Sequence, residues 1–182
     1  MQKAKWMIAG FLLILALFLL VALLLPSKVT VSKSIIINAP SLSVAGQIID
    51  FDKWKNWHPA FLDKEISVSI PANQNDSIIR SAKLHDRHGH EIIFNMLYRS
   101  MDTINVDLQT NGKRLTNYQF VILPGNKGHT QIVWNVNTNL GWYPWKKIQG
   151  IIMDKVTGQE YTLALQNLKK IAEERPVPIE SK

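Results

Sequence analysis

The sequence predicts an α+β fold: a curved, seven-stranded antiparallel sheet wrapped around one long C-terminal helix, with a separate apolar helix at the N-terminus. Three observations predict it. The run Met7–Leu25 has no charged side chain. Between residues 28 and 138, apolar and polar residues alternate, which is typical of half-buried strands. From Lys147 to Glu174 the apolar residues recur at spacings of three and four, which indicates a helix.

Composition narrows the function classes. The 182 residues include no Cys, which excludes a disulfide framework, a thiolate metal site and cysteine catalysis. The 21 Lys and Arg outnumber the 14 Asp and Glu, but they are scattered and form no basic stripe, so nucleic acid is not a predicted partner.

The apolar run Met7–Leu25 would form a helix roughly 28 Å long, close to the ~30 Å thickness of a bilayer core. Residues 1–27 are therefore predicted to be a single-pass membrane anchor. The alternative is a cleaved signal peptide, although the run exceeds the usual apolar segment of about 7–15 residues and no small-residue cleavage site follows it. Lys3 and Lys5 precede the run, which predicts a cytoplasmic N-terminus and an exported domain.

Residues 28–38 are rich in β-branched side chains and are predicted to form the first strand. Ser41 is predicted to cap a helix that ends at Ile49. A second short helix is predicted over Asp52–Trp57, ending before Pro59 because the residue before a proline avoids helical geometry.

Six further strands are predicted from alternation, with one polar face and one covered face. They are Ile66–Ile70, Ile78–Leu84, Phe94–Tyr98, Ile104–Leu108, Tyr118–Ile122 and Ile132–Val136. The helix Lys147–Glu174 supplies the cover; Gly150 and Gly158 are the positions at which it could break. The predicted domain is 28–175, followed by a tail, 176–182.

Several segments carry a family resemblance. Residues 35–40 read IIINAP, residues 51–59 contain the pattern Trp-x-x-Trp-x-Pro, and residues 153–169 contain Met-Asp-Lys, Gly158 and Leu-Gln-Asn-Leu-Lys. With the element order, these resemble the helix-grip fold of the SRPBCC superfamily, which includes START-like domains and the polyketide cyclase/dehydrase group. The resemblance covers residues 28–174. It implies a cavity between the sheet and the C-terminal helix that binds a hydrophobic ligand without a cofactor.

The side chains predicted to line this cavity come mainly from the covered face of the sheet. The predicted ligand-binding set is Trp57, His58, Arg80, Phe94, Met96, Tyr98, Val106, Leu108, Tyr118, Phe120 and Trp134. The competing interpretation is that these large side chains are ordinary core and fill the space themselves.

Polar residues of this set have two interpretations each. Arg80 alternates with residues predicted to lie on the covered face, where its guanidinium would need an acid, an anionic ligand or solvent as a partner. Alternatively, a β-bulge turns Arg80 to the other face, or its long side chain extends to solvent. His58 could act as a base, or it could hydrogen-bond within the core.

His85, His88 and His90 surround Gly89 and could bind a metal, but an exposed hairpin tip already explains them. No catalytic residue and no metal site is therefore predicted.

The segment Asn139–Trp145 contains three aromatic residues and precedes Lys146 and Lys147. It is interpreted as a packing corner, with a membrane-facing wedge as the alternative.

The sequence predicts a membrane-anchored protein that binds a hydrophobic or lipid-like small molecule. The alternatives are a polyketide cyclase- or dehydratase-like enzyme and a ligand-free interaction or stress-response module.

Overall fold

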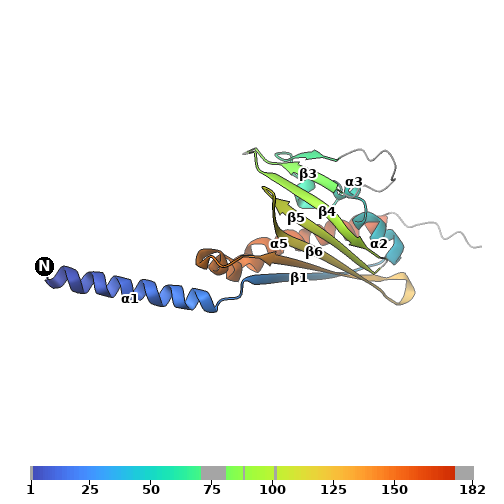
Figure 1. Cartoon of the computed structure of the whole chain (residues 1–182). Helices are drawn as coiled ribbons and strands as arrows, with labels where there is room; N and C mark the ends of the chain where they lie inside the picture. The colour runs from blue at the N-terminus through green and yellow to red at the C-terminus, as the bar shows by residue number, and fades with distance from the viewer. Residues whose placement is uncertain (1, 71–80, 88, 101, 175–182) are drawn as a thin grey trace, which may run out of the picture.

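A seven-stranded antiparallel sheet and one long C-terminal helix make up the body of the protein (Figure 1). The structure is a computed structural model that describes residues 2–70, 81–87, 89–100 and 102–174. The strands lie in the order β1-β7-β6-β5-β4-β3-β2, so every neighbouring pair except β1 and β7 is also consecutive in the chain. The predicted sheet and terminal helix are confirmed.

The elements follow the predicted order. They are α1 (Gln2–Leu24), β1 (Lys28–Ile37), α2 (Ser41–Ile48), α3 (Phe51–Trp54), α4 (Pro59–Leu62), β2 (Ser67–Ser69), β3 (Ser81–His85), β4 (Glu91–Arg99), β5 (Thr103–Thr110), β6 (Lys113–Pro124), the 3-10 helix η1 (Asn126–Gly128), β7 (Thr130–Asn139) and α5 (Pro144–Glu174).

The short helices differ from the prediction at their ends. Ser41 is the first residue of α2 and not its cap, which is Pro40 without a side-chain hydrogen bond. The predicted helix Asp52–Trp57 is the shorter α3, capped by the Asp50 carboxylate that accepts from the Asp52 amide at 3.0 Å, and a further helix that was not predicted, α4, begins at Pro59. The buried residues of the two helices are Phe51 and Trp54 in α3 and Phe61 in α4.

Helix α5 is longer than predicted and is not interrupted. It spans 31 residues from Pro144, and Gly150 and Gly158 lie within it. Both glycines are buried, and a Cβ at Gly150 would overlap Leu140 Cδ1 and lie 2.9 Å from Val29 Cγ2. The glycines thus permit close packing of α5 rather than breaking it.

The core lies between the apolar face of the sheet and the inner sides of α2, α3, α4 and α5. Its largest fully buried side chains include Phe51, Trp54, Trp57, Phe120 and Trp134. Aromatic side chains are therefore the largest single contributors to the core, and the buried side of α5 that packs on it includes the smaller residues Ala164, Leu165 and Leu168.

Helix α1 extends away from the sheet (Figure 1). Its described side chains are exposed, and the Lys147 ammonium donates to the Leu23 carbonyl at its end, at 3.4 Å. Within the described residues, no helix combines the length and hydropathy needed to cross a membrane. The predicted anchor is not supported by this finding, and its topology stays a prediction.

Candidate functional site

The rings expected to line a cavity fill most of it. Trp57, Phe120 and Trp134 have no exposed surface. Phe120 stacks on Trp134 with ring centroids 4.9 Å apart, and Tyr118 meets Trp134 edge-on at 5.0 Å. The pocket that remains between these rings and α5 has a volume of about 90 Å³, well below the ~300 Å³ of a usual ligand pocket. In the part of the chain that the structure describes, the pocket between these rings and α5 is therefore much smaller than the cavity expected for an oily ligand.

The remaining pocket is small and has a few polar groups in a mainly apolar wall, and we call it the His58 pocket. Its walls are His58, Tyr118 of β6, Trp134 of β7 and Tyr161 of α5. The other residues around it are Pro59, Ala60 and the exposed Glu160. Four elements therefore converge on a space with room for a few heavy atoms.

Local backbone geometry places His58 at this position. Its amide donates to the Trp54 carbonyl at 2.8 Å, and its own carbonyl accepts from the Phe61 amide at 2.9 Å. His58 thus closes the turn after α3 and opens α4. Its imidazole stacks on Trp54, with centroids 4.9 Å apart and an interplanar angle of 18°. The ring is held by both backbone and packing.

Three buried polar atoms of the pocket residues lack hydrogen-bond partners. Neither ring nitrogen of His58 nor Nε1 of Trp134 has a partner among the described residues. A buried polar atom without a partner costs about 1–3 kcal/mol, and native proteins pair most such atoms with protein or water. These atoms are therefore suited to a bound water or ligand group.

The titratable side chains His58, Tyr118 and Tyr161 of the pocket are uncharged at neutral pH, and the carboxylate of Glu160 lies at its exposed side. Burial lowers the pKa of His58 from 6.5 to about 3, so the imidazole is neutral, with one donor and one acceptor. Burial, reinforced by Tyr161, raises the pKa of Tyr118 well above 10. Burial also raises the pKa of Tyr161, against the opposing effect of hydrogen bonds to Thr157 and Tyr118. Such walls suit a neutral group that can donate and accept hydrogen bonds.

An apolar groove lies along the preceding turns of α5. It has a volume of about 350 Å³. Its lining residues are Leu140, Gln149, Gly150, Ile152, Met153, Val156 and Thr157. Thr157 ends the groove, and Tyr161 of the His58 pocket comes one helical turn later. We call this feature the α5 groove.

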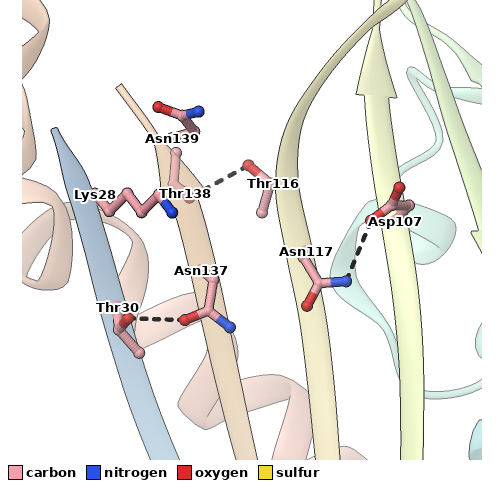
Figure 2. A pocket seen from close by; sticks show the side chains of 8 residues that line it. All are labelled: Lys28, Thr30, Asp107, Thr116, Asn117, Asn137, Thr138 and Asn139. Atoms are coloured by element: carbon pink, nitrogen blue, oxygen red, sulfur yellow. Dashed lines mark hydrogen bonds between the residues drawn. The ribbon is translucent and has the colours of Figure 1, made fainter. Parts of the chain in front are cut away.

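A larger pocket, lined by polar side chains, lies over the neighbouring strands β1, β7, β6 and β5 (Figure 2). It measures about 400 Å³, and its side chains bond to one another. Thr30 Oγ1 donates to Asn137 Oδ1 at 2.7 Å, and Asn117 Nδ2 donates to Asp107 Oδ1 at 3.2 Å (Figure 2). Because these groups already have partners, they need a ligand less than those of the His58 pocket.

The other predicted site residues fall into three groups. Phe94, Val106 and Phe120 are fully buried core, while Met96 and Leu108 are partly buried beside it. Arg80 lies outside the described residues. The predicted set omitted Tyr161, whose helical spacing marked it only as part of the packed side of α5, and Trp54, on which His58 stacks.

Tyr98 is the clear error in the predicted lining. It is 57% exposed, whereas Phe94 on the same strand is 2% exposed. The pairing of β4 with β5 shifts register between Met96 and Tyr98. A register shift of this kind reverses the face on which later residues lie, so the simple alternation no longer holds beyond Met96.

The histidine hairpin pairs with acids on its own strands. His85 Nε2 lies 3.2 Å from Glu91 Oε2, and His90 Nδ1 lies 2.7 Å from Asp86 Oδ2. His88 lies outside the described residues. In the part of the chain that the structure describes, no three His, Asp or Glu side chains are grouped closely enough to hold a metal ion.

Comparisons with known proteins identify the fold. No family model and no curated protein matches the chain. A START superfamily protein from Mycobacterium smegmatis is similar in structure, with a TM-score of 0.61 and 20% identity over 80% of this chain and 97% of that one. The ZhuI aromatase/cyclase from Streptomyces sp. R1128 has a TM-score of 0.59 and 11% identity over 85% of this chain and 99% of that one. At these identities the likeness shows an SRPBCC-like, helix-grip fold.

Proposed function

We propose that the domain binds an amphiphilic small molecule. The uncharged polar end of the ligand enters the His58 pocket, and its apolar part lies in the α5 groove. The observation that carries this proposal is the set of unpartnered buried atoms on His58 and Trp134, one helical turn beyond an apolar groove. A START-like fold is compatible with such a site.

The two volumes limit the ligand. The His58 pocket, at about 90 Å³, has the volume of about three water molecules in the liquid. It accommodates a hydroxyl, carbonyl or carboxamide group, not a ring system or an acyl chain. The α5 groove, at about 350 Å³, accepts the apolar part, and burial there contributes about 25 cal/mol per Å² before ordering costs. This arrangement replaces the single large cavity that was expected.

The second candidate function is that of a cyclase- or dehydratase-like enzyme. The cluster of His58, Tyr118 and Tyr161 favours it, because all three side chains can exchange protons. Its weakness is the basicity of the imidazole. A general base works best with a pKa near the working pH, and burial places the pKa of His58 at about 3. Binding therefore accounts for the site better than proton abstraction.

The proposal includes a membrane location. Its support is the uncharged run Met7–Leu25 and the exposure of the α1 side chains. In this proposal residues 1–27 hold the domain, residues 28–175, beside a bilayer, with the N-terminus cytoplasmic and the domain exported. An amphiphilic ligand that resides in the membrane would then be present at a high local concentration.

Native mass spectrometry of the full chain, extracted gently from its own membranes, tests the proposed function. We expect a bound small molecule on the wild-type chain. The variants His58→Phe and Trp134→Phe keep an aromatic ring but remove the unpartnered nitrogens, and each should reduce occupancy about tenfold.

Asn137→Ala, in the polar pocket of Figure 2, is the matched control and should retain the adduct. Ile152→Asp places a charge in the α5 groove and should also lose it. Repeated preparations without an adduct, or an adduct unaffected by both pocket variants, would contradict the proposal.

A further inference from the structure

Three aromatic side chains at the junction of β7 and α5, namely Trp142 and Tyr143 just before α5 and Trp145 in its first turn, are exposed to solvent, and we call them the aromatic tip. Trp142 is 69% exposed, Tyr143 38% and Trp145 58%. Trp142 stacks on Tyr143 with centroids 4.7 Å apart, and Tyr143 lies 5.0 Å from Trp145. The sequence favoured a packing corner, but the structure packs these rings against one another and leaves their outer surfaces uncovered. Exposed clusters of large rings usually mark an interaction surface.

The aromatic tip lies at the end of the domain from which α1 departs (Figure 1). The Leu140 amide, just before the tip, donates to the Ser27 carbonyl, just after α1, at 2.8 Å. The buried Lys147, just after the tip, donates to the Leu23 carbonyl. These two bonds hold the tip beside the C-terminal end of an apolar helix.

The two segments of the sequence that contain α1 and the aromatic tip have basic residues and no acidic residue. No Asp or Glu occurs in residues 1–49 or 108–153, while Lys28, Lys146 and Lys147 are present. The Lys146 ammonium lies 5.5 Å from the centroid of the Tyr143 ring, within cation–π range. Lys147 is buried, so the exposed Lys28 and the half-buried Lys146 are the cations that make the surface beside the tip complementary to anionic groups.

The apolar character continues into the first turns of α5. Ile148 is 38% exposed and Ile151 is 65% exposed. Beyond Gly158 the exposed positions are mostly polar, as in Gln159, Glu160 and Gln166, with Leu163 as an exception. Exposed apolar residues at only one end of a helix are typical of a helix whose apolar end contacts a non-aqueous surface.

We infer that the aromatic tip docks into the headgroup zone of a bilayer that contains anionic lipid. Trp and Tyr have apolar bodies and polar edges that suit this zone, and lysines beside them attract anionic headgroups. The contact is separate from α1 and from the His58 pocket. It would hold the α1 end of the domain against the membrane, with the α5 groove starting just above the headgroups.

The absence of native Cys makes a direct test possible. Single variants Trp142→Cys, Trp145→Cys and Leu163→Cys of the full chain are labelled with an environment-sensitive fluorophore. They are reconstituted into vesicles of phosphatidylcholine and phosphatidylglycerol, with and without spin-labelled lipid as a quencher. Leu163 is the matched control, because it is a 51% exposed apolar residue on the same helix, roughly 27 Å beyond Trp145.

We expect blue-shifted emission and strong lipid quenching at 142 and 145, and little of either at 163. Omission of phosphatidylglycerol should at least halve the quenching at the tip. No quenching at the tip, or equal quenching at all three positions, would overturn the inference. So would protection of the tip labels from aqueous iodide without lipid quenching, because a second copy of the chain would then cover the tip. Equal tip quenching in both lipid mixtures would overturn the anionic preference.

Discussion

His58 is the residue at which packing and polarity conflict most. Its ring is stacked on Trp54 and surrounded by Phe61, Phe94 and Trp134, yet neither ring nitrogen has a partner among the described residues. An apolar ring of similar size would avoid this desolvation cost. In the proposed function, a bound group completes the hydrogen bonds of the His58 ring. The sequence placed His58 near the site but gave no measure of its isolation.

The protonation of His58 predicts a pH dependence of stability. Burial lowers its pKa from 6.5 to about 3, so between these values the unfolded chain binds a proton that the folded chain does not. The free energy of unfolding should therefore fall as pH is lowered through this window, by up to about 1.4 kcal/mol per pH unit, and be unaffected by this group above pH 6.5. Urea unfolding at pH 7.5, 6 and 5 measures it.

His58→Phe supplies the reference for that series, because it removes the titrating group and leaves the carboxylates unchanged. Its unfolding free energy should decline less steeply than that of the wild type over the same pH values. Parallel curves for the two proteins would mean that His58 is protonated in the folded state or that solvent reaches it.

Two aromatic residues on β4 provide a residue-level test of the register shift. Phe94→Ala should destabilise the domain by about 3–5 kcal/mol, because Phe94 is 2% exposed within the ring cluster. Tyr98→Ala should change stability by no more than about 0.5 kcal/mol, because Tyr98 is 57% exposed. Chemical denaturation of both variants decides it. A large loss for Tyr98→Ala would place that side chain on the covered face, as the sequence alone suggested.

At the scale of elements, the sequence predicted the strands better than the helix ends. Alternation located six of the strands, because a period of two depends only on which face is covered, and β-branched content located the first. The helix ends were missed at Pro59 and Pro144. Pro59 was predicted to follow the end of a helix and Pro144 to lie in the loop before one, whereas each is the first residue of its helix, where its missing N–H has no cost.

Alternation also could not predict that the interior is filled. It assigns Tyr118, Phe120 and Trp134 to the covered face but says nothing about how far α5 lies from that face. That distance is set partly by Gly150 and Gly158, which were considered as breaks in the helix and not as contact points. The cavity volume therefore depended on packing that the pattern does not encode.

The close approach of α5 predicts the effect of a single added methyl group. Gly150→Ala should destabilise the domain by about 1–3 kcal/mol, because its Cβ would overlap Leu140 and crowd Val29. Gly46→Ala in α2 is the matched control, since nothing lies within 4 Å of the Cβ position. The control should be neutral or stabilise by up to about 1 kcal/mol through helix propensity. Thermal unfolding of both variants measures the difference, and equal effects would contradict the close contact.

At the scale of the whole molecule, the charges are unevenly distributed along the chain. Basic residues occur throughout, but acidic residues are absent from the segments that contain α1 and the aromatic tip.

The His58 pocket and the aromatic tip lie at different positions along α5, with the α5 groove between them. A ligand taken from a membrane would pass along an apolar path before its polar end reached His58.

We expect the domain to fold without α1. The described side chains of α1 are exposed, and the hydrogen bonds that join its C-terminal end to the rest of the protein are those of Leu23 with Lys147 and of Ser27 with Leu140. A chain that starts at Pro26 keeps Ser27 and all seven strands. Its thermal midpoint in detergent should lie within about 4 °C of that of the full chain, since the hydrogen bond lost is the long, part-buried one from Lys147 to Leu23. Circular dichroism of both chains measures this, and a truncated chain that fails to fold would show that the domain does not begin at residue 28.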